Sequence, residues 1–466
     1  MTRVFKHWPA LLIVALGTLL AACGGTPARP PTTAPVVSTA PAATKATEST
    51  PAATAVLTST AVLTPTAAAT VVLVPTSVLT PTAVLTTTAT LTTTATLTTT
   101  AAYVFGMVLV GPINDGGWSQ AQYEGMKYVE AHIPGSKFIY IDKVNPADRP
   151  NTKVEQAVDE LITQGAKFVV TNSAEFGDGT SIAAKANPNV YFVHASGDAV
   201  LAGKAPANVS NIMGRMEYGK MMAGCAAALQ TSTGKISYLG PLIDPETRRL
   251  VNAAYLGAKH CWTEVLGKPA DKLSFKVTWI GNWFNIPGVT LDPTIVANDF
   301  INGGSDVILS GIDTTEAIVE ASKATKAGKK IYAIPYDFKS ACEQAPEVCL
   351  GVPYFNWGPT YLKVIADAKA GTFTQSWNWI APDWTNINNP DTSIVGFEKG
   401  AALSTENQAK LDDFIKKLAD GSLNLYAGPL SYQDGTPFVA AGATADDKTI
   451  WYTTQLLKGV EGQSAP

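Results

Sequence analysis

Several residue types are scarce in this sequence of 466 residues, and each scarcity excludes a class of protein. Lysine and arginine together number 34 against 38 acidic residues and form no basic run, so the electrostatic footprint of a nucleic-acid-binding protein is missing. The four histidines, His7, His132, His194 and His260, show no metal-ligand spacing relative to the cysteines. We therefore expect no nucleic-acid partner, no bound metal and no cofactor.

The common catalytic motifs are also absent. The sequence contains no Gly-x-Ser-x-Gly nucleophile elbow, no His-Glu-x-x-His motif and no phosphate loop ending in Gly-Lys-Thr. No two carboxylates form an obvious pair for acid–base chemistry. The expectation is that the protein is not an enzyme and has no catalytic residue.

Long apolar runs are missing after Cys23, where no stretch approaches the roughly 20 residues of a membrane-spanning helix. Before Cys23, Arg3 and Lys6 precede a short apolar run that ends in Leu-Ala-Ala-Cys. A basic start, a short apolar core and small residues before a cut site are typical of a secretory signal. We interpret residues 1–22 as a signal peptide, with a plain transmembrane anchor as the alternative.

The Leu-Ala-Ala-Cys ending resembles the lipobox of bacterial lipoproteins. In those proteins the signal is cut just before the cysteine, which is diacylated and becomes the first residue of the mature chain. The resemblance implies a lipid anchor, such as palmitate, on Cys23. It also implies a location on the extracytoplasmic face of the cell membrane.

Residues 23–101 lack most of what a folded core requires. From residue 26 onward this segment has no glycine and no aromatic residue, and its only charges are Arg29, Lys45 and Glu48. Near-repeats of Thr, Ala, Pro, Val and Leu bury too little surface to offset the entropy of ordering the chain. We interpret the segment as a disordered stalk and a candidate for O-glycosylation. A β-repeat solenoid is the alternative, but it would need turn glycines.

Five cysteines become four if Cys23 carries lipid. These four allow three pairings, and an extracytoplasmic location permits disulfides. Cys342 and Cys349 bracket a short loop, which favours that pair and leaves Cys225 with Cys261. Metal binding is the alternative, and the histidine spacing argues against it.

From residue 102 to residue 466 the pattern changes to strands that alternate with helices. Such alternation predicts parallel sheets with helices on both faces. Two doubly wound α/β lobes joined by a hinge fit this length better than one large sheet. We place lobe 1 mainly at 103–211 and lobe 2 mainly at 212–335, with the C-terminal part crossing between them. Strands are expected at 104–110, 137–141, 168–171, 190–193, 235–240, 274–279, 306–309 and 330–334, and helices at 123–132, 151–164, 181–186, 216–230, 247–257, 293–302 and 315–327.

Aromatic, acidic and amide side chains gather where the expected strands end. Ligands of doubly wound sheets bind at these carboxyl ends. Aromatic rings stack on flat ligands, and Asp or Asn reads ring edges or sugar hydroxyls, so we expect a flat, polar ligand. The candidate ligand contacts are Asn114, Asp115, Trp118, Asp178, Trp283, Gly311, Asp313, Asp337, Asn356 and Trp357.

Plainer interpretations stay open for several candidates. Asp313 and Asp337 stand where a helix N-cap would stand. Asp178 lies between two glycines, as a turn residue does, and Trp357 precedes Gly-Pro, where it would cap a helix against the core. A lone histidine such as His194 is more typical of a structural residue than of a ligand contact.

Five motifs, in order along the chain, resemble the basic membrane protein family of lipoprotein substrate-binding proteins. The resemblance covers about Val104 to Gly459. It implies the type I periplasmic-binding-protein fold, with a three-strand hinge between two lobes. It also implies a purine nucleoside or related ligand that is handed to an ABC permease. The motifs are Gly116–Gly125, Gly214–Lys220, Trp279–Phe284, Phe355–Tyr361 and Tyr426–Leu430.

The same resemblance assigns roles to some residues. Trp118 and Trp283 match the two positions whose rings sandwich the base, and Asp178, Gly311 and Asp337 match positions near the ligand. The better-known nucleoside receptors have a lysine where Phe-Asn-Trp stands at 355–357, and this chain resembles the tryptophan-rich branch instead. A nucleoside and a free nucleobase therefore both remain open.

The expected protein is a monomeric, membrane-anchored receptor whose lobes close around a small molecule. The alternative is a receptor of the same fold for a sugar or signalling molecule, acting as a sensor. A purely structural surface protein is a third possibility.

Overall fold

The computed structural model describes residues 102–466. The predicted signal peptide, Cys23 and the stalk lie outside the described residues. Within the described part, no helix has both the length and the apolar character that crossing a membrane requires.

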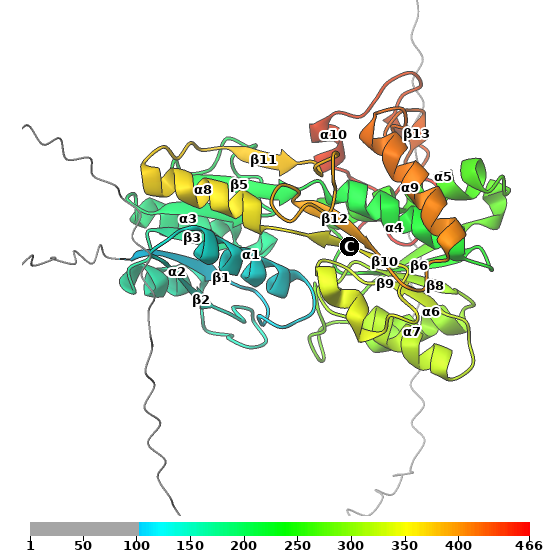
Figure 1. Cartoon of the computed structure of the whole chain (residues 1–466), viewed down its shortest axis with the longest axis horizontal. Helices are drawn as coiled ribbons and strands as arrows, with labels where there is room; N and C mark the ends of the chain where they lie inside the picture. The colour runs from blue at the N-terminus through cyan, green and yellow to red at the C-terminus, as the bar shows by residue number, and fades with distance from the viewer. Residues whose placement is uncertain (1–101) are drawn as a thin grey trace, which may run out of the picture. The chain divides into compact units, whose positions relative to one another are not determined.

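The first lobe is built on a six-stranded sheet in which every neighbouring pair is parallel. Its central strands are apolar runs buried on both faces, as parallel sheets between helices require. Helices α1 and α8 pack together on this lobe, and so do α2 and α3 (Figure 1). The strands, in spatial order, are β11 (Trp377–Ile380), β5 (Val209–Gly214), β4 (Tyr191–Ala195), β3 (Phe168–Thr171), β1 (Tyr103–Val108) and β2 (Ser136–Ile141); the helices are α1 (Trp118–His132), α2 (Val154–Thr163), α3 (Gly177–Ala186) and α8 (Gly358–Ala370).

The second lobe has a five-stranded parallel sheet. Helices α4 and α5 pack against each other, α6 packs on α7, and α9 lies against α4. The strands, in spatial order, are β15 (Val460–Glu461), β7 (Ser274–Trp279), β6 (Lys235–Gly240), β8 (Val307–Ser310) and β9 (Tyr332–Ile334); the helices are α4 (Met216–Gln230), α5 (Pro245–His260), α6 (Pro293–Asn302), α7 (Glu316–Lys326) and α9 (Thr405–Ala419).

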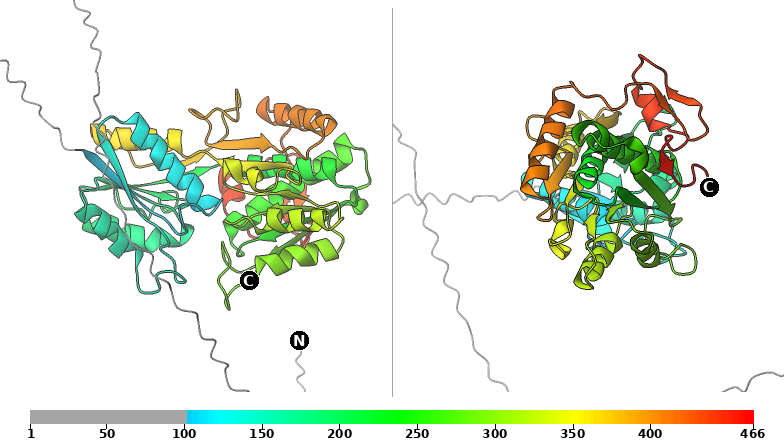
Figure 2. Two further views of the ribbon diagram at one scale, coloured as in Figure 1. Left: turned by 60° about the horizontal axis from the view of Figure 1, so that its bottom comes forward. Right: turned by 90° about the vertical axis from the view of Figure 1, so that its right-hand side faces the viewer.

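The chain passes between the lobes three times (Figure 2, left). It crosses from β5 to α4, from β10 (Gly351–Phe355) to α8, and from β11 to β12 (Val395–Lys399). Strands β10 and β12 pair antiparallel where they cross. After α9 the C-terminal segment adds an antiparallel hairpin, β13 (Leu430–Ser431) with β14 (Pro437–Val439), and the short helix α10 (Asp447–Trp451). The predicted fold class, two doubly wound lobes joined by a hinge, is confirmed.

Two disulfides lie in the part of the chain after the first crossing. Cys225 of α4 is bonded to Cys261 at the end of α5, which ties two adjacent helices together. Cys342 and Cys349 close the loop before β10. These are the pairs that the sequence favours.

Some boundaries differ from the expected ones for local reasons. Helix α1 begins at Trp118, earlier than expected, because the Asp115 carboxylate accepts hydrogen bonds from the N–H groups of Gly117, Ser119 and Gln120 (2.9, 2.9 and 3.0 Å). Trp118 is therefore the first residue of a helix and not part of the preceding loop. Helix α3 likewise begins at Gly177, so Asp178, for which a turn was one open alternative, lies in the first turn of a helix.

Candidate ligand-binding site

A small cavity of about 10 Å³ lies between the two lobes, and both contribute to its wall. This volume has room for about one water molecule, so the two lobes meet closely at the site. Its residues follow the carboxyl ends of β1, β3 and β4 in the first lobe and of β6, β7, β8 and β9 in the second. The sheets therefore present the site at the edge where doubly wound folds bind ligands. The lining residues are Trp118, Ser173, Ala174 and Ser196 from the first lobe, and Glu246, Trp283, Asp313, Tyr336 and Asp337 from the second.

Trp118 is held rigidly in the first-lobe wall. Its indole N–H donates to the backbone carbonyl of Asn172 (2.6 Å). The rings of Phe355 and Trp357 meet it edge-on, with centroids 5.4 and 5.3 Å away. Only 7% of Trp118 is exposed, so its packing leaves one orientation for the ring.

Trp283 contributes to the wall from the second lobe. It lies on the loop after β7 and is half-buried. The Asp313 N–H donates to its backbone carbonyl (2.9 Å), which links this loop to the loop after β8. Two tryptophans from opposite lobes thus line one cavity.

Asp337 directly follows the last strand of the second sheet and is fully buried. Neither of its carboxylate oxygens has a hydrogen-bond partner by distance and angle among the described residues, although the adjacent Tyr336 hydroxyl lowers the pKa of this carboxyl as a hydrogen-bond donor does. Its φ is +70°, in the left-handed region that non-glycine residues rarely adopt. A buried partnerless carboxylate and a strained backbone both cost free energy, and such features cluster at ligand sites.

Hydrogen bonds from the hinge hold this strained conformation of Asp337. Its N–H donates to the carbonyl of Pro353 (3.2 Å), and its carbonyl accepts from the N–H of Phe355 (3.0 Å). Both partners belong to β10, one of the strands that cross between the lobes. The position of the Asp337 carboxylate is thus coupled to the hinge.

Two further acids share the cavity with Asp337. Burial raises the pKa of Asp313 well above its usual range, and the nearby charge of Asp337 raises it further. Burial likewise raises the pKa of Asp337, against the opposing effect of Lys220. Glu246, in the first turn of α5, has its pKa raised to about 8 by burial, although Arg249 favours its charged form. Bringing these carboxyls together in one buried space makes ionisation costly until a ligand compensates it.

Lys220 is the base whose charge acts on Asp337, and it does not itself line the cavity. Its side chain, on α4, is buried, and Nζ donates to the Ser310 carbonyl (2.7 Å). Nζ also lies 3.1 Å from the ring centroid of Tyr336, in a cation–π contact. Lys220 therefore supports the Tyr336–Asp337 segment without lining the cavity.

The lobes touch directly beside the cavity. A Cβ added to Gly117 would lie 1.9 Å from the Asp313 carbonyl oxygen, so the start of α1 abuts the second lobe. On another side, the Trp451 indole N–H donates to the Asp198 carboxylate (3.3 Å), joining α10 to the loop after β4. The structure thus shows the lobes in contact around the cavity.

Four of the sequence-predicted residues meet in this cavity: Trp118, Trp283, Asp313 and Asp337. Neither aspartate is a helix N-cap, because Thr315 caps α7 and Phe338 caps the short 3-10 helix that follows Asp337. Asp178 lies in an outer groove that shares Ala174, Ser196 and Glu246 with the cavity.

The other predicted residues lie outside the cavity. Asn114 is exposed, and Asp115 holds the start of α1, with its pKa raised to about 6 by burial. Gly311 lies against the ring of Tyr238. The Asn356 amide donates to the carbonyls of Pro390 and Ser393 (2.9 and 2.8 Å). Trp357 is fully buried behind Trp118.

Five lining residues were not among the predicted ones. Four of them follow strand ends, where the rule that selected the tryptophans would also have found them. Ser196 carries a further structural signal, a φ of +56° just past β4. Glu246 follows the Asp-Pro start of α5 and has no comparable signal in the sequence. The five are Ser173, Ala174, Ser196, Glu246 and Tyr336.

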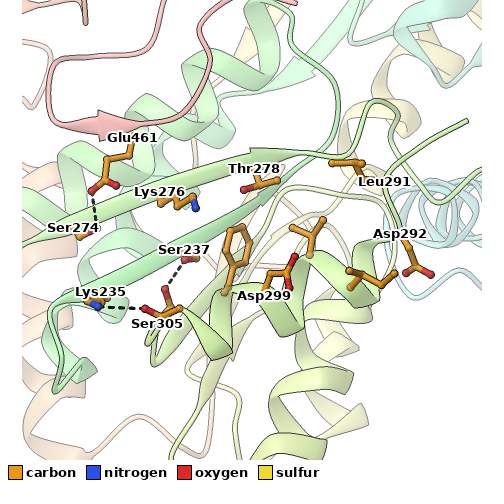
Figure 3. Close-up of a pocket in the computed structure, with 14 residues that line it drawn as sticks. Lys235, Ser237, Ser274, Lys276, Thr278, Leu291, Asp292, Asp299, Ser305 and Glu461 are labelled. Carbon is orange, nitrogen blue, oxygen red and sulfur yellow. Dashed lines mark hydrogen bonds between the residues drawn. The ribbon is translucent and has the colours of Figure 1, made fainter.

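A second hollow lies on the outer face of the second lobe, along α6 and β7 (Figure 3). Its polar side chains largely satisfy one another: Ser237 bonds Ser305 (2.6 Å) and Ser274 donates to Glu461 (2.7 Å). Strand β7 alternates buried and exposed residues, which is typical of a sheet face in contact with water. This hollow contains none of the predicted ligand contacts.

The fold and the cavity together define a class of protein. Two doubly wound lobes, three crossings that form a hinge, and a cavity between the lobes at the strand ends are the features of a two-lobed solute-binding protein.

Comparison with known proteins identifies the family. The family model described as Bmp, ABC transporter substrate-binding protein PnrA-like, matches residues 102–419. The chain belongs to this family. Its members are substrate-binding proteins of ABC transporters rather than enzymes, and they work on the extracytoplasmic side of the membrane.

Two curated relatives match most of the chain. A purine-binding protein of Brucella abortus (strain 2308) is 28% identical over 358 residues, covering 76% of this chain and 92% of the relative. A putative ABC transporter glucose-binding protein of Haloferax volcanii is 28% identical over 359 residues, covering 76% of this chain and 80% of the relative.

Solved structures agree on the fold. A solute-binding protein of an ABC transporter system from Aeropyrum pernix K1 has a TM-score of 0.55 at 13% identity, covering 75% of this chain and 95% of that one. Another from Conexibacter woesei DSM 14684 has a TM-score of 0.51 at 18% identity, covering 69% of this chain and 98% of that one.

Proposed function

We propose that this protein is a lipid-anchored receptor that binds a purine nucleoside or nucleobase between its lobes and delivers it to the permease of an ABC importer. The observation that carries the proposal is the pair of tryptophans, Trp118 and Trp283, on opposite lobes of a cavity that also contains the partnerless Asp337. The indole rings would stack on a flat base, and the carboxylate would accept hydrogen bonds from ring N–H groups or sugar hydroxyls. The match to a purine-binding relative supports the same ligand class.

The mechanism would be closure of the lobes about the hinge. A ligand that first stacks on Trp118 meets Trp283 and the acids only when the second lobe closes over it. The ligand shifts the population toward the closed form by the free energy of these added contacts. The permease would recognise the closed form, and an acylated Cys23 with its stalk would keep the receptor close to the membrane.

Binding of purines by the purified protein tests the proposal. Titration calorimetry with adenine, adenosine and guanosine should give saturable binding, and Trp283→Ala should weaken it at least about tenfold through loss of stacking. Trp384→Ala is the matched control, because Trp384 is also half-buried, packs against Tyr218 and does not line the cavity. A protein that binds no purine at all would overturn the proposal.

A sugar is the second candidate ligand, because one relative is named as a glucose-binding protein. Aromatic rings also stack on sugar faces, and carboxylates also accept from hydroxyls. A titration with glucose separates the two: binding of glucose without purines would favour a sugar receptor, acting in transport or as a sensor. A structural surface protein would show no ligand-induced rise in melting temperature with either.

A further inference from the structure

The C-terminal segment that follows α10 is attached to the second lobe. Arg248 of α5 donates through Nε to the Thr453 carbonyl (3.1 Å). Asn252, also on α5, donates to the Gln455 carbonyl (3.0 Å) and accepts from the Leu457 N–H (2.8 Å). Strand β15 then pairs with β7 at the edge of the second sheet. Helix α10 directly precedes these attachment points, so we expect it to move with the second lobe.

Trp451, the last residue of α10, nevertheless contacts the first lobe. Its indole N–H donates to the carboxylate of Asp198, on the loop after β4 (3.3 Å). The rings of Trp377 and Trp379, both on β11, lie perpendicular to its ring, with centroids 5.1 and 5.2 Å away. Burial raises the pKa of Tyr452 to about 12, and Asp198 raises it further as a hydrogen-bond acceptor does. Trp451 is only 4% exposed, so it is packed into this junction.

The second lobe holds Trp451 through Arg249 of α5. The guanidinium carbon of Arg249 lies 4.1 Å from the Trp451 ring centroid, in a cation–π contact. The same guanidinium donates through Nε to Glu217 (2.7 Å), and its Nη2 lies 3.6 Å from Glu246, which lines the cavity. A continuous set of contacts therefore runs from the cavity wall through Arg249 and Trp451 to Asp198 of the first lobe.

The start of α10 is fixed at the hinge. Asp447 pairs with the guanidinium of Arg215, which lies 4.3 Å from the ring centroid of Trp379. The Arg215 Nε donates to the Trp379 carbonyl (3.1 Å), and its backbone N–H donates to the Ile380 carbonyl (2.7 Å). Arg215 lies at the first crossing between the lobes, and Ile380 ends the strand before the third. These contacts set the position from which Trp451 reaches the first lobe.

The contact between Trp451 and Asp198 spans the space between the lobes. Asp198 lies on the loop after β4, which is not one of the three crossings. Both residues line the outer groove, which shares Ala174, Ser196 and Glu246 with the cavity. Separating the lobes at the cavity therefore requires this contact to break.

We infer that α10 is a latch between the lobes, in which Trp451 holds the first lobe at Asp198 and slows the opening of the ligand site. Each opening must break a buried hydrogen bond to a carboxylate and separate packed aromatic rings. The latch lies beyond residue 419, where the match to the family model ends. It acts on the protein with or without ligand, and only its effect on ligand release rests on the proposed function.

Removing either partner of the hydrogen bond tests the latch. Trp451→Phe keeps an aromatic ring but loses the indole N–H, and Asp198→Ala loses the acceptor. Small-angle scattering of the empty protein should give a larger radius of gyration for both variants than for wild type. Stopped-flow measurement should show adenosine release about tenfold faster in Trp451→Phe and at least as fast in Asp198→Ala. The double variant should release adenosine no faster than Asp198→Ala, because both substitutions remove the same contact.

Trp262→Phe is the matched control. Trp262 is also 4% exposed, donates its indole N–H to the Pro269 carbonyl (2.9 Å) and lies 4.0 Å from the ammonium of Lys268, all within the second lobe. This variant should keep the radius and the release rate of wild type, and melting temperatures establish that every variant folds.

Three results would each overturn the latch: an unchanged radius in the empty variants, an unchanged release rate, or additive effects in the double variant. If adenosine and the other purines do not bind at all, the proposed function fails. The scattering of the empty variants then decides the latch by itself.

Discussion

The two walls of the cavity are built differently. The first-lobe wall is uncharged, and its one large side chain, Trp118, is locked by a hydrogen bond and by rings packed behind it. The second-lobe wall carries all three acids, the half-buried Trp283 and the strained Asp337. We infer from this difference that the two walls have different roles in ligand binding. Under the proposed function, the first lobe would offer a rigid stacking platform, and the second would bring polar recognition as the lobes close.

The largest effect on stability and binding should come from removing the Trp118 side chain. Trp118→Ala should lower the free energy of unfolding by about 3–5 kcal/mol, because it empties a packed site, and should also abolish measurable purine binding. Trp283→Ala should weaken binding but cost much less stability, since Trp283 is only half-buried. Urea denaturation alongside calorimetry checks both. Equal stability losses in the two variants would contradict the proposed difference between the walls.

A smaller effect on ligand affinity should come from a substitution that prevents the two walls of the cavity from meeting. Gly117→Ala places a methyl group against the Asp313 carbonyl, where an added Cβ would lie 1.9 Å from the oxygen. We expect affinity to fall about 10- to 100-fold with both walls intact, because closure is blocked. With ligand present, small-angle scattering should show a larger radius of gyration for Gly117→Ala than for the wild-type protein.

Gly303→Ala is the control for this substitution. Gly303 ends α6 with an ordinary helical φ of −72° and lies outside the cavity. Its substitution should leave affinity and radius unchanged. A Gly117→Ala protein that binds as tightly as wild type would show that the contact at Asp313 does not limit closure.

The acids of the second wall should make binding depend on pH. Their pKa values are raised by burial in the empty cavity, to about 8 for Glu246, and a ligand that donates hydrogen bonds favours their ionised forms. Affinity for adenosine should therefore rise with pH up to the pKa of the empty site, by at most about tenfold per unit for each proton released. The neighbouring titratable groups Lys220, whose pKa is lowered by burial, Arg249 and Asp115 set where this rise ends.

Calorimetry at one pH in two buffers of different ionisation enthalpy measures that proton release directly. Proton release should shrink in Asp337→Asn. Binding without proton exchange and without pH dependence would mean that the acids do not contact the ligand.

The smallest expected effect is on the stability of the empty protein. The pKa of Glu246 is raised above its unfolded value, so its contribution to stability is present at low pH and is lost as pH rises through about 8. The melting temperature without ligand should fall between pH 6 and pH 9. Glu246→Gln should reduce that fall, and a fall of the same size in the variant would assign it to other groups.

Much of the fold could be predicted because hydrophobic periodicity reports local burial. Helix α4 and strand β6 lie within the predicted bounds, since apolar residues dominate the buried positions of each. Strand β5 was missed because Ser210 and Asn211 interrupt it, although both are fully buried. Their side chains bond the neighbouring segment at Thr374 and the loop at Val200, partners that local pattern does not reveal.

The candidate site could be predicted only where a chemical signal coincided with a strand end. Trp118 and Asp337 satisfied both conditions and lie in the cavity. Asn356 also follows a strand, yet its amide bonds to backbone carbonyls of the loop before β12. Glu246 lines the cavity although no sequence feature predicts it, because its position depends on how α5 faces the other lobe.

The amino-acid sequence by itself determined that the chain carries two sets of α/β units and a set of aromatic and acidic residues at their strand ends. It did so because burial periodicity and strand-end chemistry are local properties. Only the tertiary structure decided which of those residues meet. Trp118 and Trp283 belong to different sheets, and the three crossings of the hinge bring them to one cavity. The same crossings bury Asp337 without a donor, because the hinge strand β10 holds its backbone in place.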